Sequence, residues 1–178
     1  QGIISMRGAI TILILAWIIS TVVSEMHTGE YLSTLVAGNI HAGFLPVILF
    51  MLAGVMAFAT GTSWGTFGIM LPIAAAMAVK VEPSLIIPCM SAVMAGAVFG
   101  DHCSPISDTT ILSSTGAHCN HIDHVTSQFP YALTVAASAA TGYLALGMTG
   151  SAPLGFVVTG IVMVVLILIL KDKKKATA

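Results

Sequence analysis

The residues best suited to chemistry in this chain lie together at positions 100–110. This stretch reads Gly-Asp-His-Cys-Ser-Pro-Ile-Ser-Asp-Thr-Thr and stands within a strongly apolar sequence. An ionisable residue inside a membrane-spanning segment costs roughly 2.5–3.5 kcal/mol on insertion scales, so such residues commonly mark ion or proton pathways. The stretch therefore predicts a site that binds ions or protons.

The side chains of this stretch suit Na⁺ and H⁺. Na⁺ is a hard cation that prefers the oxygen ligands that carboxylates and hydroxyls supply. A proton and Na⁺ can compete for one desolvated carboxylate, which is the simplest chemical basis for Na⁺/H⁺ exchange; an imidazole can also titrate near neutral pH. The alternative is that the two carboxylates only cap half-helices. The predicted ion- and proton-binding residues are Asp101, His102, Ser104, Ser107, Asp108, Thr109 and Thr110, with Na⁺ at Asp101 and Asp108.

Pro105 predicts a break in a helix, because proline is costly in a helix interior and well suited to its first turn. One half-helix is expected to end near Phe99 and Gly100, and the next to start at Ser104 as N-cap. The two ends present free carbonyl and N–H groups to the break. Broken helices of this kind form ion and substrate sites in secondary transporters.

The composition identifies an integral membrane protein. Hydrophobic residues make up 57% of the 178 residues and charged residues 7%, with a mean hydropathy of +1.00, whereas soluble domains carry about 25% charged residues. The three cysteines predict no disulfide framework. The chain has no phosphate-binding glycine loop, nucleophile-elbow motif or basic–aromatic face. We therefore expect no enzyme, no bound cofactor and no nucleic-acid partner, and contact with membrane lipid.

Apolar segments predict an all-α polytopic fold, since a spanning helix needs about 20 apolar residues. The fold has about four spanning helices plus a re-entrant hairpin, or six spans, and one interrupted helix. The basic tail is expected in the cytoplasm by the positive-inside rule. The predicted segments are 8–23 (span), 44–79 (re-entrant hairpin or two spans), 84–115 (broken span), 127–146 (span), 154–170 (span) and 171–178 (basic tail).

A second polar break, at 61–66, carries glycines, hydroxyls and Trp64 but no charge. As the tip of a re-entrant hairpin it would line the same site from the opposite side, because backbone can leave a helix at membrane depth only where it is buried or lines a cavity. In a two-span arrangement the tip lies at the membrane face instead. The predicted tip residues are Gly61, Thr62, Ser63 and Thr66.

A third polar cluster, at 118–124, contains three histidines and a cysteine. We interpret it as a loop in which Asn120 and Asp123 open the next helix as a capping pair. Zinc binding and pH sensing are the alternatives. A membrane metalloenzyme that uses His102, His118, His121 and His124 is a more distant one.

The three polar clusters together resemble the C-terminal half of the NhaC-type Na⁺/H⁺ antiporter family. The matching motifs are residues 61–67, 100–110 and 121–125, together with Ala16-Trp17 in the first span. The resemblance implies a secondary transporter of the bacterial inner membrane within the broader ion-transporter superfamily, whose inverted halves each carry a re-entrant hairpin and a broken helix. It also implies an N-terminal half elsewhere as a partner in the site, and a homodimer is a further expectation.

The sequence therefore predicts an antiporter that exchanges Na⁺ for H⁺. The nearest alternative adds a small carboxylate such as malate or lactate as substrate, because a half-helix N-terminus can receive an anion. Lys80 is the only Lys or Arg between Arg7 and Lys171, which weakens that alternative. A non-transporting membrane subunit is the alternative from another class.

Overall fold

The described part of the protein consists of helices joined by short turns. The computed structural model describes residues 14, 18, 21, 22, 25–27, 31, 34 and 41–176, with side chains as far as 171. Most of the predicted span 8–23 lies outside these residues. Within 41–176 there is no strand, which confirms the all-α prediction. The elements are η1 (Ala42–Phe44), α3 (Leu45–Thr60), α4 (Ser63–Val81), η2 (Pro83–Leu85), α5 (Ile86–Cys103), α6 (Asp108–Gly116), α7 (His121–Thr149) and α8 (Ala152–Ala176).

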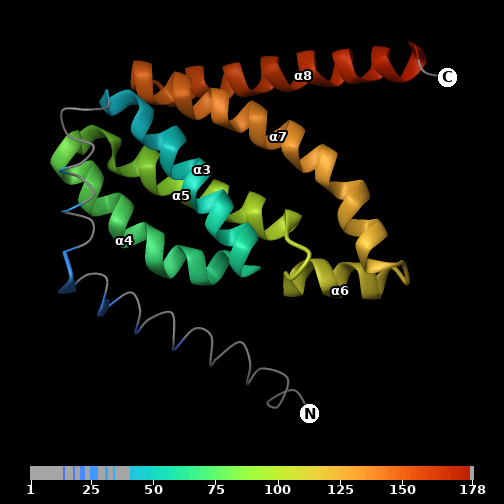
Figure 1. The fold of residues 1–178 in the computed structure, drawn as a ribbon. Helices are drawn as coiled ribbons and strands as arrows, with labels where there is room; N and C mark the ends of the chain where they lie inside the picture. Colours follow the sequence, from blue (N-terminus) through green and yellow to red (C-terminus); the bar gives the residue numbers. More distant parts are fainter. Residues whose placement is uncertain are drawn as a thin grey trace.

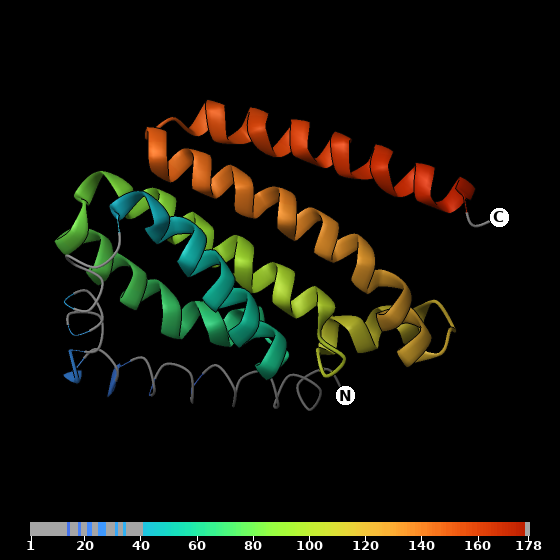
Figure 2. The same ribbon diagram turned by 45° about the horizontal axis from the view of Figure 1, so that its top comes forward.

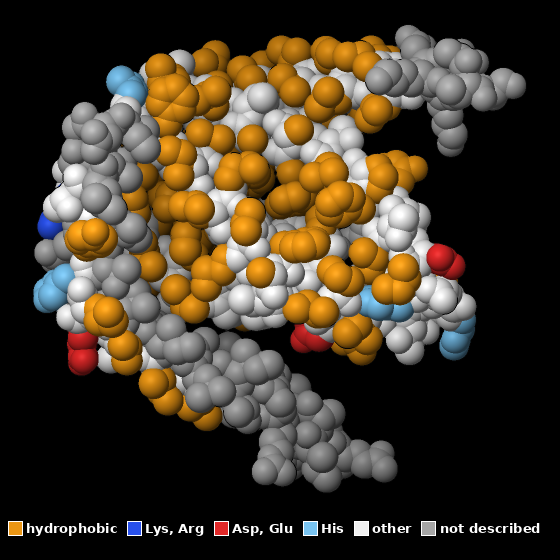
Figure 3. Space-filling model, in the orientation of Figure 1, with side chains coloured by type: hydrophobic (Ala, Val, Ile, Leu, Met, Phe, Trp, Pro, Cys, Tyr) orange, Lys and Arg blue, Asp and Glu red, His pale blue; other side chains and the backbone are white. Residues whose placement is uncertain are grey.

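Five of the described helical segments are long and apolar enough to cross a membrane. Their hydropathies lie between 1.3 and 2.8. Figure 3 shows hydrophobic side chains over most of one face, with few charged side chains, most of them near its margins. This distribution confirms a polytopic membrane protein. The five segments are Ala42–Thr60, Ser63–Val81, Pro83–Cys103, His121–Thr149 and Ala152–Lys171.

Helices α3 and α4 form a tight helical hairpin. Gly61 ends α3 in the left-handed conformation with φ 69°, and its N–H donates to the Ala57 carbonyl at 2.8 Å. Only glycine adopts this backbone conformation without a steric cost. The Thr62 hydroxyl then accepts from Gly65 N–H at 3.4 Å and opens α4. A helical hairpin is expected both for a re-entrant hairpin and for two full spans at residues 44–79. Each of its two helices is long enough to span a membrane.

Helix α5 packs against both α3 and α4, and it also contacts α6 and α7 (Figures 1 and 2). Small residues let α3 and α5 approach closely: a Cβ at Gly96 would overlap the Phe50 carbonyl, and one at Gly100 would overlap the Gly54 carbonyl. Close approach through small residues is the usual way in which helices associate in lipid. The buried core of these three helices consists of Leu45, Leu49, Ala53, Ala57, Met70, Ile73, Ala74, Met77, Ala78, Leu85, Cys89, Val93 and Ala97.

The break in the predicted span 84–115 lies further along the chain than the sequence suggested. Helix α5 runs through Gly100 to Cys103, and α6 begins at Asp108 with Ser107 as its N-cap, so the predicted start at Ser104 is wrong. Gly100 serves helix packing instead of ending the helix. Ser104 is extended, with ψ 128°, because the proline that follows disfavours the helical conformation. Residues 104–107 therefore form a turn, and Pro105 lies within it.

The last two helices run back over the hairpin and α5. Helix α7 begins at His121, earlier than the predicted 127, because the Asn120 side chain accepts from Ile122 and Asp123 N–H and caps it. This confirms Asn120 as the N-cap. Helix α7 packs on α3 and α5, and α8 packs on α7 (Figures 1 and 2). Gly150, with φ 69°, makes the turn between them.

Candidate ion-binding site

Asp101 is a buried carboxylate whose two oxygens both accept hydrogen bonds from serine hydroxyls. It lies in the last turn of α5 and is 6% exposed. Ser63 Oγ donates to Asp101 Oδ2 at 2.9 Å, and Ser107 Oγ donates to Asp101 Oδ1 at 2.6 Å. Ser63 opens α4, and Ser107 closes the turn at 104–107. The carboxylate thus joins the two polar breaks of the sequence.

The hairpin tip and the 104–107 turn touch through their backbones. A Cβ on Gly61 would lie 2.9 Å from the Ile106 carbonyl oxygen, so a glycine fits here for space as well as for conformation. This contact holds the start of α4 next to the end of α5 and explains why Ser63 reaches Asp101. The other tip hydroxyls serve α4 itself: Thr62 caps it, and Thr66 Oγ1 donates to the Thr62 carbonyl at 2.9 Å.

A third hydroxyl extends the cluster towards the surface. Ser107 Oγ lies 2.7 Å from Thr109 Oγ1. Because the single Ser107 proton is directed to Asp101, Thr109 donates to Ser107. The hydroxyl chain therefore runs from the exposed Thr109, through the buried Ser107, to the buried Asp101. Ser104 is also buried and accepts from Ile106 N–H at 3.3 Å, within the turn.

The remaining predicted site residues lie apart from this cluster. Asp108 is exposed on the first turn of α6. His102 is exposed, and its Nδ1 donates to the carbonyl of Val98 on its own helix at 2.9 Å. Thr110 Oγ1 donates to the His102 carbonyl at 3.4 Å. The structure thus brings Asp101, Ser63, Ser107 and Thr109 together, whereas the side chains of Asp108 and His102 are exposed and hydrogen-bond to none of these four.

The hydrogen-bond partners of the Asp101 carboxylate are both hydroxyls in the part of the chain that the structure describes. No lysine or arginine side chain there contacts its carboxylate. Lys80 lies in the last turn of α4, about 25 Å along the helix axis from Ser63 at 1.5 Å per residue.

No metal cluster of the zinc type occurs among the described residues. Nowhere in that part of the chain do three His, Cys, Asp or Glu side chains gather closely enough to hold a metal ion. His121, which sequence reasoning placed in a loop, contacts the 104–107 turn: its Nε2 lies 2.6 Å from the Pro105 carbonyl oxygen. The sequence signals at this position were the preceding Asn120 cap, the histidine cluster at 118–124 and the family motif at 121–125, and none of them indicated a contact with the turn.

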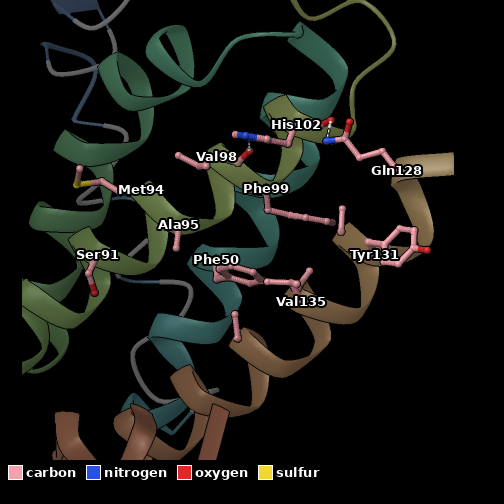
Figure 4. A pocket seen from close by; sticks show the side chains of 13 residues that line it. Phe50, Ser91, Met94, Ala95, Val98, Phe99, His102, Gln128, Tyr131 and Val135 are labelled. Carbon is pink, nitrogen blue, oxygen red and sulfur yellow. Dashed lines mark hydrogen bonds between the residues drawn. The ribbon is translucent and has the colours of Figure 1, made fainter. Parts of the chain in front are cut away.

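An apolar cavity of about 760 Å³ lies between α3, α5 and α7 on another side of α5. Figure 4 shows Phe50, Phe99 and Tyr131 along it, with His102 and Gln128 at one end. Gln128 Nε2 donates to the His102 backbone carbonyl at 3.0 Å, so this amide is already engaged. Asp101 is not among the residues that line the cavity.

Comparison with known proteins identifies the family of the chain. The model of the Na⁺/H⁺ antiporter family matches residues 1–148. An uncharacterized protein of Haemophilus influenzae is 63% identical over 172 residues, which are 97% of this chain and 33% of that protein. No solved structure matches the chain at a significant level.

Two further relatives carry transport names. The malate-2H(+)/Na(+)-lactate antiporter of Bacillus subtilis is 35% identical over 48% of this chain and 18% of its own length. An uncharacterized Na(+)/H(+) antiporter of Haemophilus influenzae is 32% identical over 59% of this chain and 22% of its own length. The chain thus spans about a third or less of the curated relatives it matches. With the family match covering most of its residues, the chain belongs to the Na⁺/H⁺ antiporter family.

Proposed function

We propose that this chain supplies the cation- and proton-binding carboxylate of a multi-pass Na⁺/H⁺ exchanger of the bacterial inner membrane, and that Asp101 is that carboxylate. The observation that supports this most directly is the burial of Asp101 between two serine hydroxyls from the two polar breaks. Family membership supports an antiporter in general.

The chemistry of the cluster suits both ions in turn. A serine hydroxyl has one proton and two lone pairs, so Ser63 and Ser107 can donate to Asp101 and still offer oxygen to a cation. Na⁺ would find the carboxylate and both hydroxyl oxygens in one place, which is the oxygen donor set that hard cations prefer. A proton on the same carboxylate removes its charge. Only one of the two ions can then neutralise Asp101 at a time.

The test is the collapse of a respiration-driven pH gradient in everted bacterial membrane vesicles that contain the protein at full length. We expect added Na⁺ to collapse the gradient with the parent protein and to have no effect with Asp101→Asn. Asp123→Asn is the matched control, because this exposed carboxylate lies in the first turn of α7, away from the cluster. An Asp101→Asn protein that responds to Na⁺ like the parent would refute the proposal.

Asp108→Asn tests the second carboxylate that the sequence predicted. Because Asp108 is exposed in the described part of the chain, we expect a smaller loss of Na⁺ response than with Asp101→Asn. A complete loss with Asp108→Asn and a normal response with Asp101→Asn would assign the ion to Asp108 instead.

Coupled exchange of a small carboxylate is the second candidate, supported by the similarity to the malate-2H(+)/Na(+)-lactate antiporter. The same vesicles test it by addition of malate or lactate after Na⁺. A gradient that collapses only with Na⁺ and a carboxylate together would favour this candidate over simple exchange. The lack of a basic side chain next to Asp101 in the described residues favours the simple exchanger.

A further inference from the structure

His121 makes two hydrogen bonds that tie together three separate segments. Its Nε2 lies 2.6 Å from the Pro105 carbonyl oxygen in the 104–107 turn, and its Nδ1 lies 3.1 Å from Ser114 Oγ on α6. His121 itself is the first residue of α7. One partly buried imidazole therefore joins the turn, α6 and the start of α7.

The bond to Pro105 exists in both protonation states of the imidazole. A carbonyl oxygen can only accept, so Nε2 carries a proton in either state. In the neutral ring Nδ1 accepts from Ser114 Oγ. In the protonated ring Nδ1 donates to Ser114 Oγ, which then donates to the Ile111 carbonyl at 2.9 Å. The contact is therefore built to hold the turn regardless of the charge on His121.

Apart from the short bond of Ser107 Oγ to Asp101, the hydrogen bonds within the turn are long. Ser107 N–H donates to the Ser104 carbonyl at 3.3 Å, and Ile106 N–H donates to Ser104 Oγ at 3.3 Å; both are at the long end of the range for N–H···O bonds. Pro105 has no N–H to contribute. The short bond from His121 is thus an external anchor for the turn, and it lies two residues before Ser107.

We propose that His121 is a positioning residue, which holds the 104–107 turn through Nε2 so that the Ser107 hydroxyl stays on Asp101. This role rests on the proposed function of Asp101 and adds to it a residue that does not touch the ion. Loss of the bond between His121 and Pro105 would let the turn move, and the cation would then lose the Ser107 hydroxyl oxygen as a ligand. Partners that orient a metal ligand typically change metal affinity by about 10–100-fold, and we expect roughly tenfold here.

Two variants separate the two bonds of the ring. In His121→Gln the amide N–H occupies the place of Nε2 and retains the bond to Pro105, whereas His121→Asn reaches only the place of Nδ1 and retains the bond to Ser114. We expect His121→Asn to raise the Na⁺ concentration for half-maximal exchange roughly tenfold with little change in maximal rate, and His121→Gln to stay close to the parent. His118→Asn is the control for replacement of a histidine by asparagine. The His118 side chain is exposed, and its backbone has the left-handed conformation with φ 53°, which asparagine tolerates.

A second readout does not depend on transport. Cys103 is 2% exposed and directly precedes the turn. With Cys119→Ser and Cys89→Ala in place, Cys103 is the one cysteine left within residues 1–178, and peptide mapping of the maleimide adduct reports on it alone. We expect faster labelling in His121→Asn and parental labelling in His121→Gln and His118→Asn. Faster labelling in a protein without Na⁺-dependent exchange would support the anchor while refuting the proposed function.

The outcomes that overturn the proposal are specific. Equal effects of His121→Gln and His121→Asn on half-saturation and on labelling would show that the bond to Pro105 is not the anchor. A shifted pH dependence of exchange in His121→Gln would show that the ring takes part in proton transfer instead. Even if His121→Asn fails to assemble, a raised half-saturation or rapid labelling of His121→Gln overturns the proposal.

Discussion

The close packing of α5 on α3 makes Gly100→Ala the most informative test of the fold beside the site. A Cβ at Gly100 would overlap the Gly54 carbonyl and lie 2.7 Å from Phe58 N and 2.9 Å from Ala57 Cβ. These are backbone or short-side-chain atoms of a helix, so relief requires the two helices to move apart. Overpacking of a well-packed core typically costs 1–3 kcal/mol, and the rigid neighbours place this case near the upper end.

The net effect of Gly100→Ala is smaller than the packing cost, because alanine is a better helix former than glycine by about 0.5–1 kcal/mol. We therefore expect a net loss of about 2 kcal/mol. Gly160→Ala in α8 is the matched control, since nothing lies within 4 Å of its added Cβ and only the gain in helix formation remains. The measurement is the thermal unfolding midpoint of the protein at full length in detergent.

We expect the midpoint to fall by several degrees in Gly100→Ala and to stay level or rise in Gly160→Ala. Gly100 immediately precedes Asp101, so the same change should also weaken Na⁺-dependent exchange by displacing the carboxylate from Ser63. Equal stability of the two variants would show that α3 and α5 do not touch at Gly100, and the geometry of the site would then need revision.

Two further predictions test the contacts that frame the site. Gly61→Ala should destabilise the hairpin by about 1–2 kcal/mol, because a non-glycine residue is strained at φ 69°. The added Cβ would also collide with Ile106 in the 104–107 turn. Thermal unfolding measures the loss of stability. Tyr143→Phe should cost about 0.5–1.5 kcal/mol by removing the bond from Tyr143 OH to the Ser91 carbonyl at 3.0 Å, which joins α7 to α5. Tyr131→Phe, at a side chain that is 75% exposed, should cost nothing measurable in the same assay.

The sequence was sufficient to predict the class of fold and the segments that meet at the site. Polar residues in an apolar chain are expensive, so the breaks at 61–66 and 100–110 stand out without any structure. The pairing of Ser63 with Asp101 follows from the turn at Gly61 and its contact with Ile106. That contact depends on how α3, α4 and α5 pack, which local sequence patterns do not encode.

The position at which α5 ends determines which of the two carboxylates is buried, and the sequence-based prediction of this position was wrong. Extension of α5 to Cys103 places Asp101 within a helix that packs on α3 and α4, while Asp108 opens α6 and is exposed. The cause lies in Pro105, which ended α5 at the residue before Ser104 but did not begin the next helix. The sequence singled out His121 but not its contact with the turn, because its partner Pro105 is 16 residues away and comes within reach only where the chain turns back at α7.

The position of Asp101 between two elements links ion binding to their arrangement. Ser107 lies six residues from Asp101 on the same segment, whereas Ser63 lies 38 residues away on the hairpin. A shift of the hairpin relative to α5 that breaks the contact between Gly61 and Ile106 would therefore remove the Ser63 oxygen, while the Ser107 oxygen stays on the same segment as Asp101. The cation would lose a ligand, while a protonated, neutral carboxyl has less need of that partner. If Asp101 binds both ions as proposed, movement of the hairpin would discriminate between a bound Na⁺ and a bound proton, as an exchanger that alternates between the two requires.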